Sequence, residues 1–286
     1  MNKKIYIVIP AHNEEAHLSK TLESLANQTF LPKKVVVVND ASTDGTQKII
    51  DQFSEKYSFI EGVFYNSQKI HEPGSKVINA FYKGFEKLDN NFDVICKYDS
   101  DLIFPKNYLE KINTIFQSDI SVGMVGGFCY VERDGEWILE NLTNKDHIRG
   151  ALKAYRKECF EQIKGLKNAM GWDTVDELLA QYHGWKIKTD TSLQVKHLKP
   201  TGKVYTKISK YKQGEAFYKM RYGFWLTLIA SAKMASKKNS LSFFVDSMKG
   251  FQKAKKAKLE FIVSEKEGEF IRKLRWDNIR MKIGIR

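Results

Sequence analysis

The chain has 286 residues, which is enough for one large α/β domain with an appendage. Its net charge of +13 is uneven: residues through 198 carry 25 Lys and Arg against 27 Asp and Glu, whereas residues from Lys199 onward carry 22 against 7. Three widely spaced cysteines argue against a disulfide framework or a zinc site and favour reduced thiols in the cytoplasm. No apolar run is long enough to span a bilayer, and the short strand that follows Lys4 argues against an export signal.

The first elements of the chain predict a doubly wound sheet. Residues 4–9 are predicted as a buried strand that ends at Pro10, and leucines at positions 18, 22 and 25 form a helical stripe after it. Residues 35–38 are four valines, typical of a central parallel strand, and a polar loop and a helix at 47–53 follow. This order indicates an α/β fold whose loops gather at one edge of the sheet.

Two aspartates in the loop after the second strand have different explanations. Asp44 can accept hydrogen bonds from the free backbone N–H groups of the following helix, so we treat it as structural. Asp40 lies at the C-terminal end of the strand, where ligands of such sheets bind. We expect Asp40 to accept hydrogen bonds from the base or ribose of a nucleotide.

A third strand at 60–65 and a helix at 77–88 frame the sequence Gly74-Ser75-Lys76. A helix N-terminus attracts anions, but the spacing of a P-loop is missing. Lys76 therefore has two explanations of equal weight, a contact to a diphosphate or a solvated lysine.

The sequence Asp99-Ser100-Asp101 follows a short apolar run at 94–98 that predicts a buried strand. Side chains alternate along a strand, so the two carboxylates point the same way if the chain stays extended. Carboxylate oxygens suit Mg²⁺ or Mn²⁺, which proteins often hold through one or two carboxylates and the phosphates of a substrate. Taken alone, the tripeptide is better explained as a solvated turn.

Residues 122–131 and 137–139 are predicted to form a hairpin around Asp134-Gly135. Residues 149–165 are predicted to form a further segment, with a helix near 157–164.

A later helix begins at Trp172 and ends before Gly184. Its first turns hold Asp173, Asp176 and Glu177, which a cap and the helix dipole explain on their own. They are also where a general base could lie, with Trp172 as a flat platform for an acceptor sugar ring. His197, between a strand and a Pro-Gly turn, is either structural or completes a metal site.

The C-terminal part, residues 205–286, is predicted as a separate basic and helical extension of a domain at 1–204. Residues 215–235 are helical and rich in aromatic residues, and lysines flank and follow them. Such a helix suits the headgroup layer of an anionic membrane, and packing on the first domain is the alternative. No nucleic-acid-binding module accompanies the basic residues, so we expect no nucleic-acid partner.

Five motifs together resemble a known family: IPAHNEE at 9–15, VVVVNDASTDGT at 35–46, YDSD at 98–101, GWDTVDE at 171–177 and VKH at 195–197. Over residues 4–202 the chain is similar to family 2 glycosyltransferases, inverting enzymes with the GT-A fold that use nucleotide-activated sugars. The resemblance implies a GT-A mixed sheet, Mg²⁺ or Mn²⁺ as cofactor, and a nucleotide-sugar donor, with UDP as the first guess.

The resemblance also implies the role of each site residue. The nucleoside pocket would be lined by Pro10, Ala11, Glu14 and Asp40. Asp99, followed by Ser100, would face the ribose or the ion, Asp101 would be the chief ligand of the ion, and His197 would assist the ion or the diphosphate. The family's base lies in an acidic pair, and here Asp173 and Asp176, with Glu177, compete for that role; the distance to Gly184 favours Asp173.

The expected protein is thus an inverting glycosyltransferase that acts from the cytoplasm, peripheral to the inner face of the plasma membrane, on a glycan or lipid-linked acceptor of the cell envelope. One alternative is a sugar nucleotidyltransferase, although residues 9–15 lack the glycine-rich phosphate loop of that class. Another is a catalytically inactive scaffold that binds membranes or polyanions.

Overall fold

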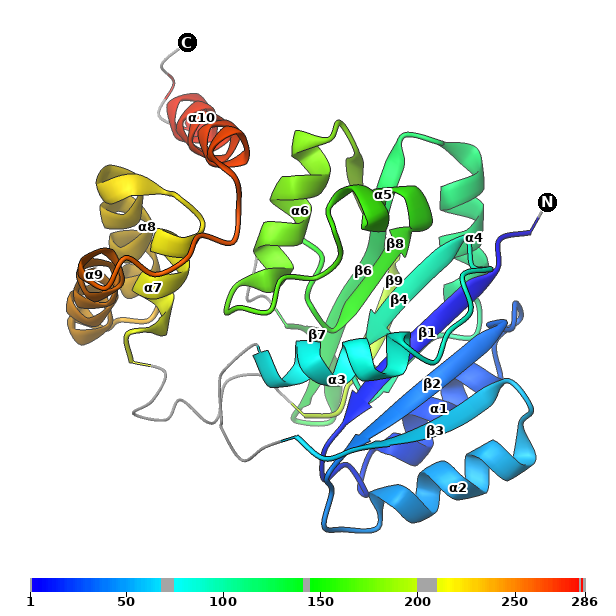
Figure 1. Ribbon diagram of the computed structural model, residues 1–286. Helices are drawn as coiled ribbons and strands as arrows, with labels where there is room; N and C mark the ends of the chain where they lie inside the picture. Colours follow the sequence, from blue (N-terminus) through cyan, green and yellow to red (C-terminus); the bar gives the residue numbers. More distant parts are fainter. Residues whose placement is uncertain (1, 68–74, 141–144, 200–209, 283, 285–286) are drawn as a thin grey trace. The chain divides into compact units, whose positions relative to one another are not determined.

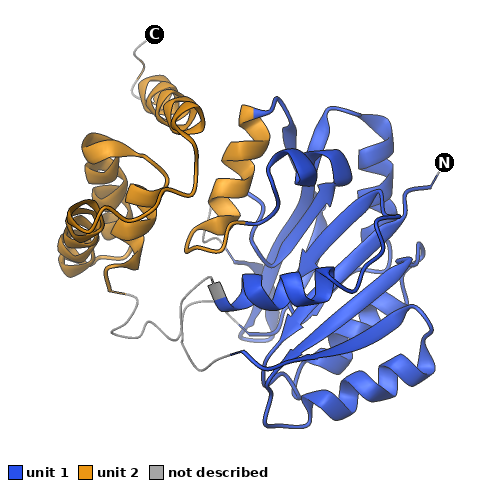
Figure 2. Ribbon diagram, viewed as in Figure 1, with its two compact units in different colours: residues 1–72, 76–166, 183–201 blue, residues 73–75, 167–182, 202–286 orange. Residues whose placement is uncertain are grey.

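The computed structural model describes residues 2–67, 75–140, 145–199, 210–282 and 284 (Figure 1). The chain divides into two compact units (Figure 2). Unit 1 comprises residues 1–72, 76–166 and 183–201, and unit 2 comprises residues 73–75, 167–182 and 202–286. The predicted domain boundary at 204 lies outside the described residues and stays a prediction.

The residues of unit 1 that the structure describes form a nine-stranded mixed sheet. Its strands are β1 (Ile5–Ala11), β2 (Lys34–Asp40), β3 (Ile60–Tyr65), β4 (Val94–Tyr98), β5 (Leu102–Ile103), β6 (Val122–Arg133), β7 (Glu136–Leu139), β8 (Leu152–Arg156) and β9 (Lys186–His197). They lie in the order β3-β2-β1-β4-β8-β6-β9-β5, and β7 pairs with β6 in the predicted hairpin. The first four strands of this order run parallel, whereas β8 is antiparallel to β4 and β6.

Helices cover both faces of this sheet (Figure 1). They are α1 (Leu18–Ala26), α2 (Thr46–Lys56), α3 (Ser75–Phe85), α4 (Tyr108–Ser118) and α5 (Lys157–Gln162). A Cβ at Gly84 of α3 would lie 3.3 Å from Val36 in β2, whereas a Cβ at Gly62 in β3 would lie 2.4 Å from Ile50 of α2. Gly62 pairs with Val37, and the side chains of Val36 and Val37 point to opposite faces of the sheet because the two residues are neighbours on β2. The helices α3 and α2 therefore pack on opposite faces. The two glycines let the helices approach the sheet closely.

The strand β8 lies in the middle of the sheet, in the segment 149–165 to which the sequence analysis assigned no strand. Its sequence contains two cations, Lys153 and Arg156, that are only 0% and 5% exposed. The Arg156 guanidinium donates to the carbonyl oxygens of Val122 at 2.8 Å and Phe116 at 2.7 Å, so its charge is compensated inside the sheet. Cations are rarely this buried, so Lys153 and Arg156 interrupt the apolar pattern by which a strand is recognised in a sequence.

Unit 2 contains five described helices: α6 (Trp172–Tyr182), α7 (Lys212–Lys219), α8 (Gly223–Lys237), α9 (Leu241–Lys256) and α10 (Glu265–Lys282). The predicted continuous helix at 215–235 is wrong in one respect, because it breaks between α7 and α8. Arg221 and Gly223 adopt φ angles of 55° and 74° there, which a helix does not tolerate. Arg221 is held in this turn by the ring of Phe261, 3.7 Å from its guanidinium.

The helices of unit 2 pack through small residues. A Cβ at Gly214 of α7 would lie 1.7 Å from the Ser247 carbonyl oxygen of α9, and a Cβ at Gly250 of α9 would lie 2.0 Å from the Tyr211 carbonyl oxygen. None of the helices that the structure describes has the length and apolar character that a membrane-spanning segment requires.

Candidate functional site

The loops after β1 and β2 are fastened to each other at the C-terminal edge of the sheet. Ala11, 2% exposed at the end of β1, pairs with Asn39 of β2, and Pro10 before it is half-buried. Beyond the strands, the Glu14 backbone N–H donates to the Thr46 hydroxyl at 2.8 Å. These contacts join the loop that carries Glu14 to the loop that follows Asp40, so the two predicted pocket motifs lie in one region.

Asp40 is buried at the end of β2, with 3% of its surface exposed. Its carboxylate accepts from the Ser67 backbone N–H at 3.3 Å and lies 3.5 Å from the Lys76 ammonium. Lys76 is therefore drawn to a carboxylate at the predicted nucleoside pocket instead of being simply solvated. Asp44 accepts from the Thr46 backbone N–H at 3.1 Å, which is the structural role expected for it.

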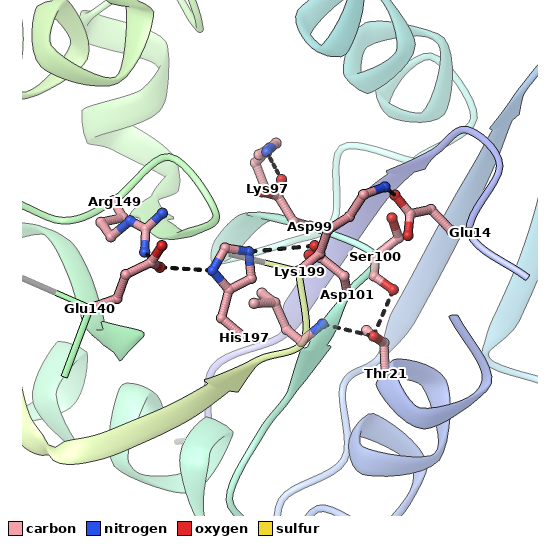
Figure 3. A network of polar contacts seen from close by, with 11 residues as sticks. Glu14, Thr21, Lys97, Asp99, Ser100, Asp101, Glu140, Arg149, His197 and Lys199 are labelled. Atoms are coloured by element: carbon pink, nitrogen blue, oxygen red, sulfur yellow. Dashed lines mark hydrogen bonds and ion pairs between the residues drawn. The ribbon is translucent and has the colours of Figure 1, made fainter. Parts of the chain in front are cut away.

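The first aspartate of the Asp-Ser-Asp motif forms an ion pair that the sequence analysis missed. Asp99 is 36% exposed, and its carboxylate contacts Lys97, whose side chain is 2% exposed (Figure 3). Lys97 also donates to the Gly150 carbonyl oxygen at 3.1 Å. Burial alone would raise the pKa of Asp99, but the Lys97 charge lowers it, so the carboxylate stays ionised.

The middle of the motif is fixed by one hydroxyl. Thr21 of α1 donates to the Ser100 carbonyl oxygen at 2.8 Å and accepts from the Leu102 backbone N–H at 3.0 Å. Ser100 itself is 5% exposed. The turn between β4 and β5 is thereby attached to α1, and Asp99 and Asp101 are held at fixed places.

The second aspartate lies beside the predicted histidine, although 96 positions separate them in the chain. The Asp101 carboxylate is 3.4 Å from His197 Nε2, and the neighbouring Leu102 and His197 pair in the β5–β9 ladder (Figure 3). Burial alone would lower the pKa of His197, but hydrogen bonds to Asp101 and Glu140 raise it to about 9.

Glu140 and Arg149 complete a polar chain that the sequence analysis did not find. Glu140 Oε2 lies 2.8 Å from His197 Nδ1, and the same carboxylate forms an ion pair with Arg149. Glu140, His197 and Cys129 form a group whose potential ligand atoms lie within 4.8 Å of one another. Burial raises the pKa of the Cys129 thiol to about 12.

Lys199 is a second basic residue that the motifs did not mark. Its ammonium lies 3.1 Å from Glu14 Oε1, which connects the loop after β1 to the segment after β9. Burial raises the pKa of Glu14 in spite of this contact, and the Asp101 charge adds to the increase. Glu14 and Asp101 are therefore close enough to interact.

The predicted acceptor-side residues lie at the start of α6, in unit 2. Trp172 is 6% exposed, Asp176 is 0% exposed and Glu177 is 7% exposed, whereas Asp173 is half-buried. The structure thus brings Glu14, Asp99, Asp101 and His197 together in unit 1 and pairs Asp40 with Lys76. The roles of the four residues of α6 stay predictions.

Comparison with known proteins agrees with this arrangement. The model of the family described as Glycosyl transferase family 2 matches residues 6–166, more than half of the chain. The probable glycosyltransferase YdaM of Bacillus subtilis is 34% identical over 148 residues, which cover 51% of this chain and 34% of YdaM. This chain therefore spans about a third of the length of that relative.

Two solved structures have the same fold. TarS of S. aureus in complex with UDP-GlcNAc has a TM-score of 0.58 at 18% identity, covering 76% of this chain and 64% of that one. The mannosyltransferase PcManGT from Pyrobaculum calidifontis, in complex with GDP-Man and Mn²⁺, has a TM-score of 0.57 at 13% identity, covering 98% of this chain and 81% of that one. The predicted GT-A fold is confirmed.

Proposed function

Because the chain belongs to glycosyl transferase family 2, we propose that it transfers a sugar, with inversion, from a nucleoside diphosphate donor to a hydroxyl of a glycan or lipid-linked acceptor. UDP is the nucleotide that we test first. TarS was solved with UDP-GlcNAc and PcManGT with GDP-Man, so both bases are included in the experiment below.

The observation that carries this proposal is the pairing of Asp101 with His197. Two residues from distant parts of the sequence lie 3.4 Å apart, are 7% and 4% exposed, and adjoin Asp99 at the edge of the sheet where ligands bind in this fold class. Burying a carboxylate and an imidazole costs free energy, so such an arrangement favours a binding role.

The other residues of unit 1 named above would contact different parts of the donor. Asp40 would accept hydrogen bonds from the base or ribose, and Lys76, at its 3.5 Å distance, could turn to the diphosphate when a nucleoside takes its place at Asp40. Lys199, 59% exposed at its side chain, is a second cation suited to phosphate oxygens. Pro10 and Ala11 would contact the base.

The residues present fit a divalent ion at the diphosphate. The Asp101 carboxylate is a hard ligand of the kind that Mg²⁺ and Mn²⁺ prefer, with phosphate oxygens as the other ligands, and His197 would support the same end of the donor. When bound, the ion would act as a Lewis acid toward the leaving diphosphate.

The acceptor hydroxyl would attack the anomeric carbon from the face opposite the diphosphate. A new C–O bond forms while the bond from the anomeric carbon to the phosphate oxygen breaks, and the hydroxyl proton passes to a carboxylate of α6. Asp173 is the better candidate for this base, because it is half-buried while Asp176 is fully buried.

We further propose that residues 205–286 attach the enzyme to an anionic membrane surface, where a lipid-linked acceptor would lie. Three large apolar residues near the start of α8 are exposed: Phe224 at 46%, Trp225 at 65% and Ile229 at 39%. The excess of 22 basic over 7 acidic residues from Lys199 onward complements anionic lipid. Sedimentation with anionic vesicles should be reduced in Trp225→Ser and unchanged in Ile120→Ser, whose side chain is 82% exposed in unit 1.

Donor use is tested with a panel of UDP- and GDP-sugars, measuring release of the nucleoside diphosphate with and without Mn²⁺. We expect metal-dependent release that is lost in Asp101→Asn and kept in Asp134→Asn, an exposed aspartate in the turn after β6. Release that is indifferent to Asp101→Asn would reject the proposed site. Nucleotide binding without release for any donor would favour an inactive scaffold.

A further inference from the structure

The side chain of His197 is held at both ring nitrogens. Nδ1 lies 2.8 Å from Glu140 Oε2 and Nε2 lies 3.4 Å from Asp101 Oδ2. A histidine placed in this way cannot rotate about χ2 without losing a contact to a carboxylate. The contact of Nδ1 with Glu140 therefore determines that Nε2 is the ring nitrogen that faces Asp101.

Glu140 is itself fixed from two directions. Its backbone N–H donates to the Cys129 carbonyl oxygen at 2.9 Å, which places it beside β6 directly after β7. Its carboxylate, 5% exposed, forms an ion pair with Arg149, whose side chain is 13% exposed. The Arg149 charge thus compensates the charge of the buried Glu140 carboxylate.

The group of Cys129, Glu140 and His197 could alternatively form a separate metal site. The charges argue against it. Arg149 already contacts the Glu140 carboxylate, so a cation placed there would meet a fixed positive charge. The carboxylate of Glu140 is better explained as the partner of His197.

We propose that Glu140, held by Arg149, is the positioning residue of His197: it accepts from Nδ1 and thereby directs Nε2 toward Asp101 and the diphosphate end of the donor. This inference rests on the proposed function. The structural reason is that a carboxylate behind a histidine fixes both its orientation and its basicity, an effect usually worth about 10–100-fold in the affinity of a metal site.

The test is a double-mutant cycle on the full chain, with the affinity for UDP measured by calorimetry in the presence and absence of Mn²⁺. We expect Glu140→Gln to weaken Mn²⁺-dependent UDP binding by about 10-fold or more, with little change in binding without the metal. In the His197→Ala background the same substitution should change binding by less than about 3-fold, because a residue that acts through His197 has nothing left to position. Glu136→Gln, an exposed glutamate on the adjacent strand β7, is the matched control and should behave as the unaltered chain.

Glu140→Gln leaves the Arg149 charge without this carboxylate, so folding is checked by thermal unfolding. If that variant does not fold, Glu140→Gln combined with Arg149→Met removes both charges together and is entered into the same cycle. An equal loss in the His197→Ala background would overturn the inference, because it would mean that Glu140 acts on the fold and not through His197. Unchanged UDP binding in Glu140→Gln would also overturn it while leaving the proposed function intact. A lack of nucleotide binding by the unaltered chain rejects the proposed function and this inference with it.

Discussion

The ion pair between Lys97 and Asp99 predicts an asymmetric response to removal of either charge. Lys97 is 2% exposed at its side chain, and Asp99 is 36% exposed. Asp99→Asn leaves a buried ammonium with the Gly150 carbonyl oxygen at 3.1 Å but without the carboxylate. Breaking a buried pair costs about 3–5 kcal/mol in general, and the retained carbonyl contact places our expectation at about 3 kcal/mol of the free energy of unfolding.

The reverse substitution, Lys97→Met, should cost only about 1 kcal/mol, because water reaches the Asp99 carboxylate and compensates for the lost ammonium. The double variant should recover most of the loss seen in Asp99→Asn, since no buried charge then remains unpaired. Urea unfolding monitored by circular dichroism measures all four proteins. A cost of Lys97→Met equal to or above that of Asp99→Asn would refute the reasoning.

The same pair has a predictable pH dependence. The pKa of Asp99 is lowered by Lys97, so its contribution to stability is present above the unfolded pKa of about 4 and is lost as the pH falls through the folded pKa. The difference in stability between the unaltered chain and Lys97→Met should therefore be largest near pH 7 and shrink below about pH 4. A difference that grows on acidification would contradict this assignment.

Three further predictions concern the support of the site, the packing of unit 2 and the base. Thr21→Val removes a hydroxyl that makes two buried hydrogen bonds. It should lower the free energy of unfolding, measured by urea titration, by about 1–3 kcal/mol and weaken UDP binding. If neither quantity changes, the turn after β4 is held by other contacts. Gly250→Ala would place a Cβ 2.0 Å from the Tyr211 carbonyl oxygen, so it should destabilise the protein by about 1–3 kcal/mol in thermal unfolding, and an unchanged melting temperature would contradict the α7–α9 packing. Asp173→Asn should reduce kcat by about 10²–10⁴-fold with the nucleotide affinity unchanged; if Asp176→Asn has that effect instead, the base is misassigned, and if neither has it, the base lies elsewhere.

Much of the sheet could be predicted from the sequence because its strands consist of uninterrupted apolar runs. Residues 35–38 are four buried valines, and a run of β-branched residues of this kind is typical of a strand covered on both faces. The strand β8 could not be predicted in this way, because Lys153 and Arg156 occupy buried positions through contacts that only the folded chain supplies. The turn that interrupts the aromatic helix of unit 2 depends likewise on the distant ring of Phe261.

The candidate site shows the same division. Asp40, Asp99, Asp101 and His197 were found because each stands in a motif at the end of a predicted strand. Glu140 is in no motif, and its closeness to His197 follows from the pairing of β6 with both β7 and β9. A residue such as Glu140, which contacts a motif residue from another strand, is placed by the order of the strands in the sheet. That order cannot be read from a local stretch of a single sequence.

The central claim is that Asp101 and His197 hold the diphosphate end of a nucleotide together with a divalent ion. Crystals of the protein grown with UDP and Mn²⁺, with anomalous diffraction collected at the manganese edge, test it most directly. The account predicts a single manganese peak in coordination contact with an Asp101 carboxylate oxygen, with the uridine beside Asp40. A manganese peak remote from Asp101, or a uridine bound away from the loops after β1 and β2, would contradict it.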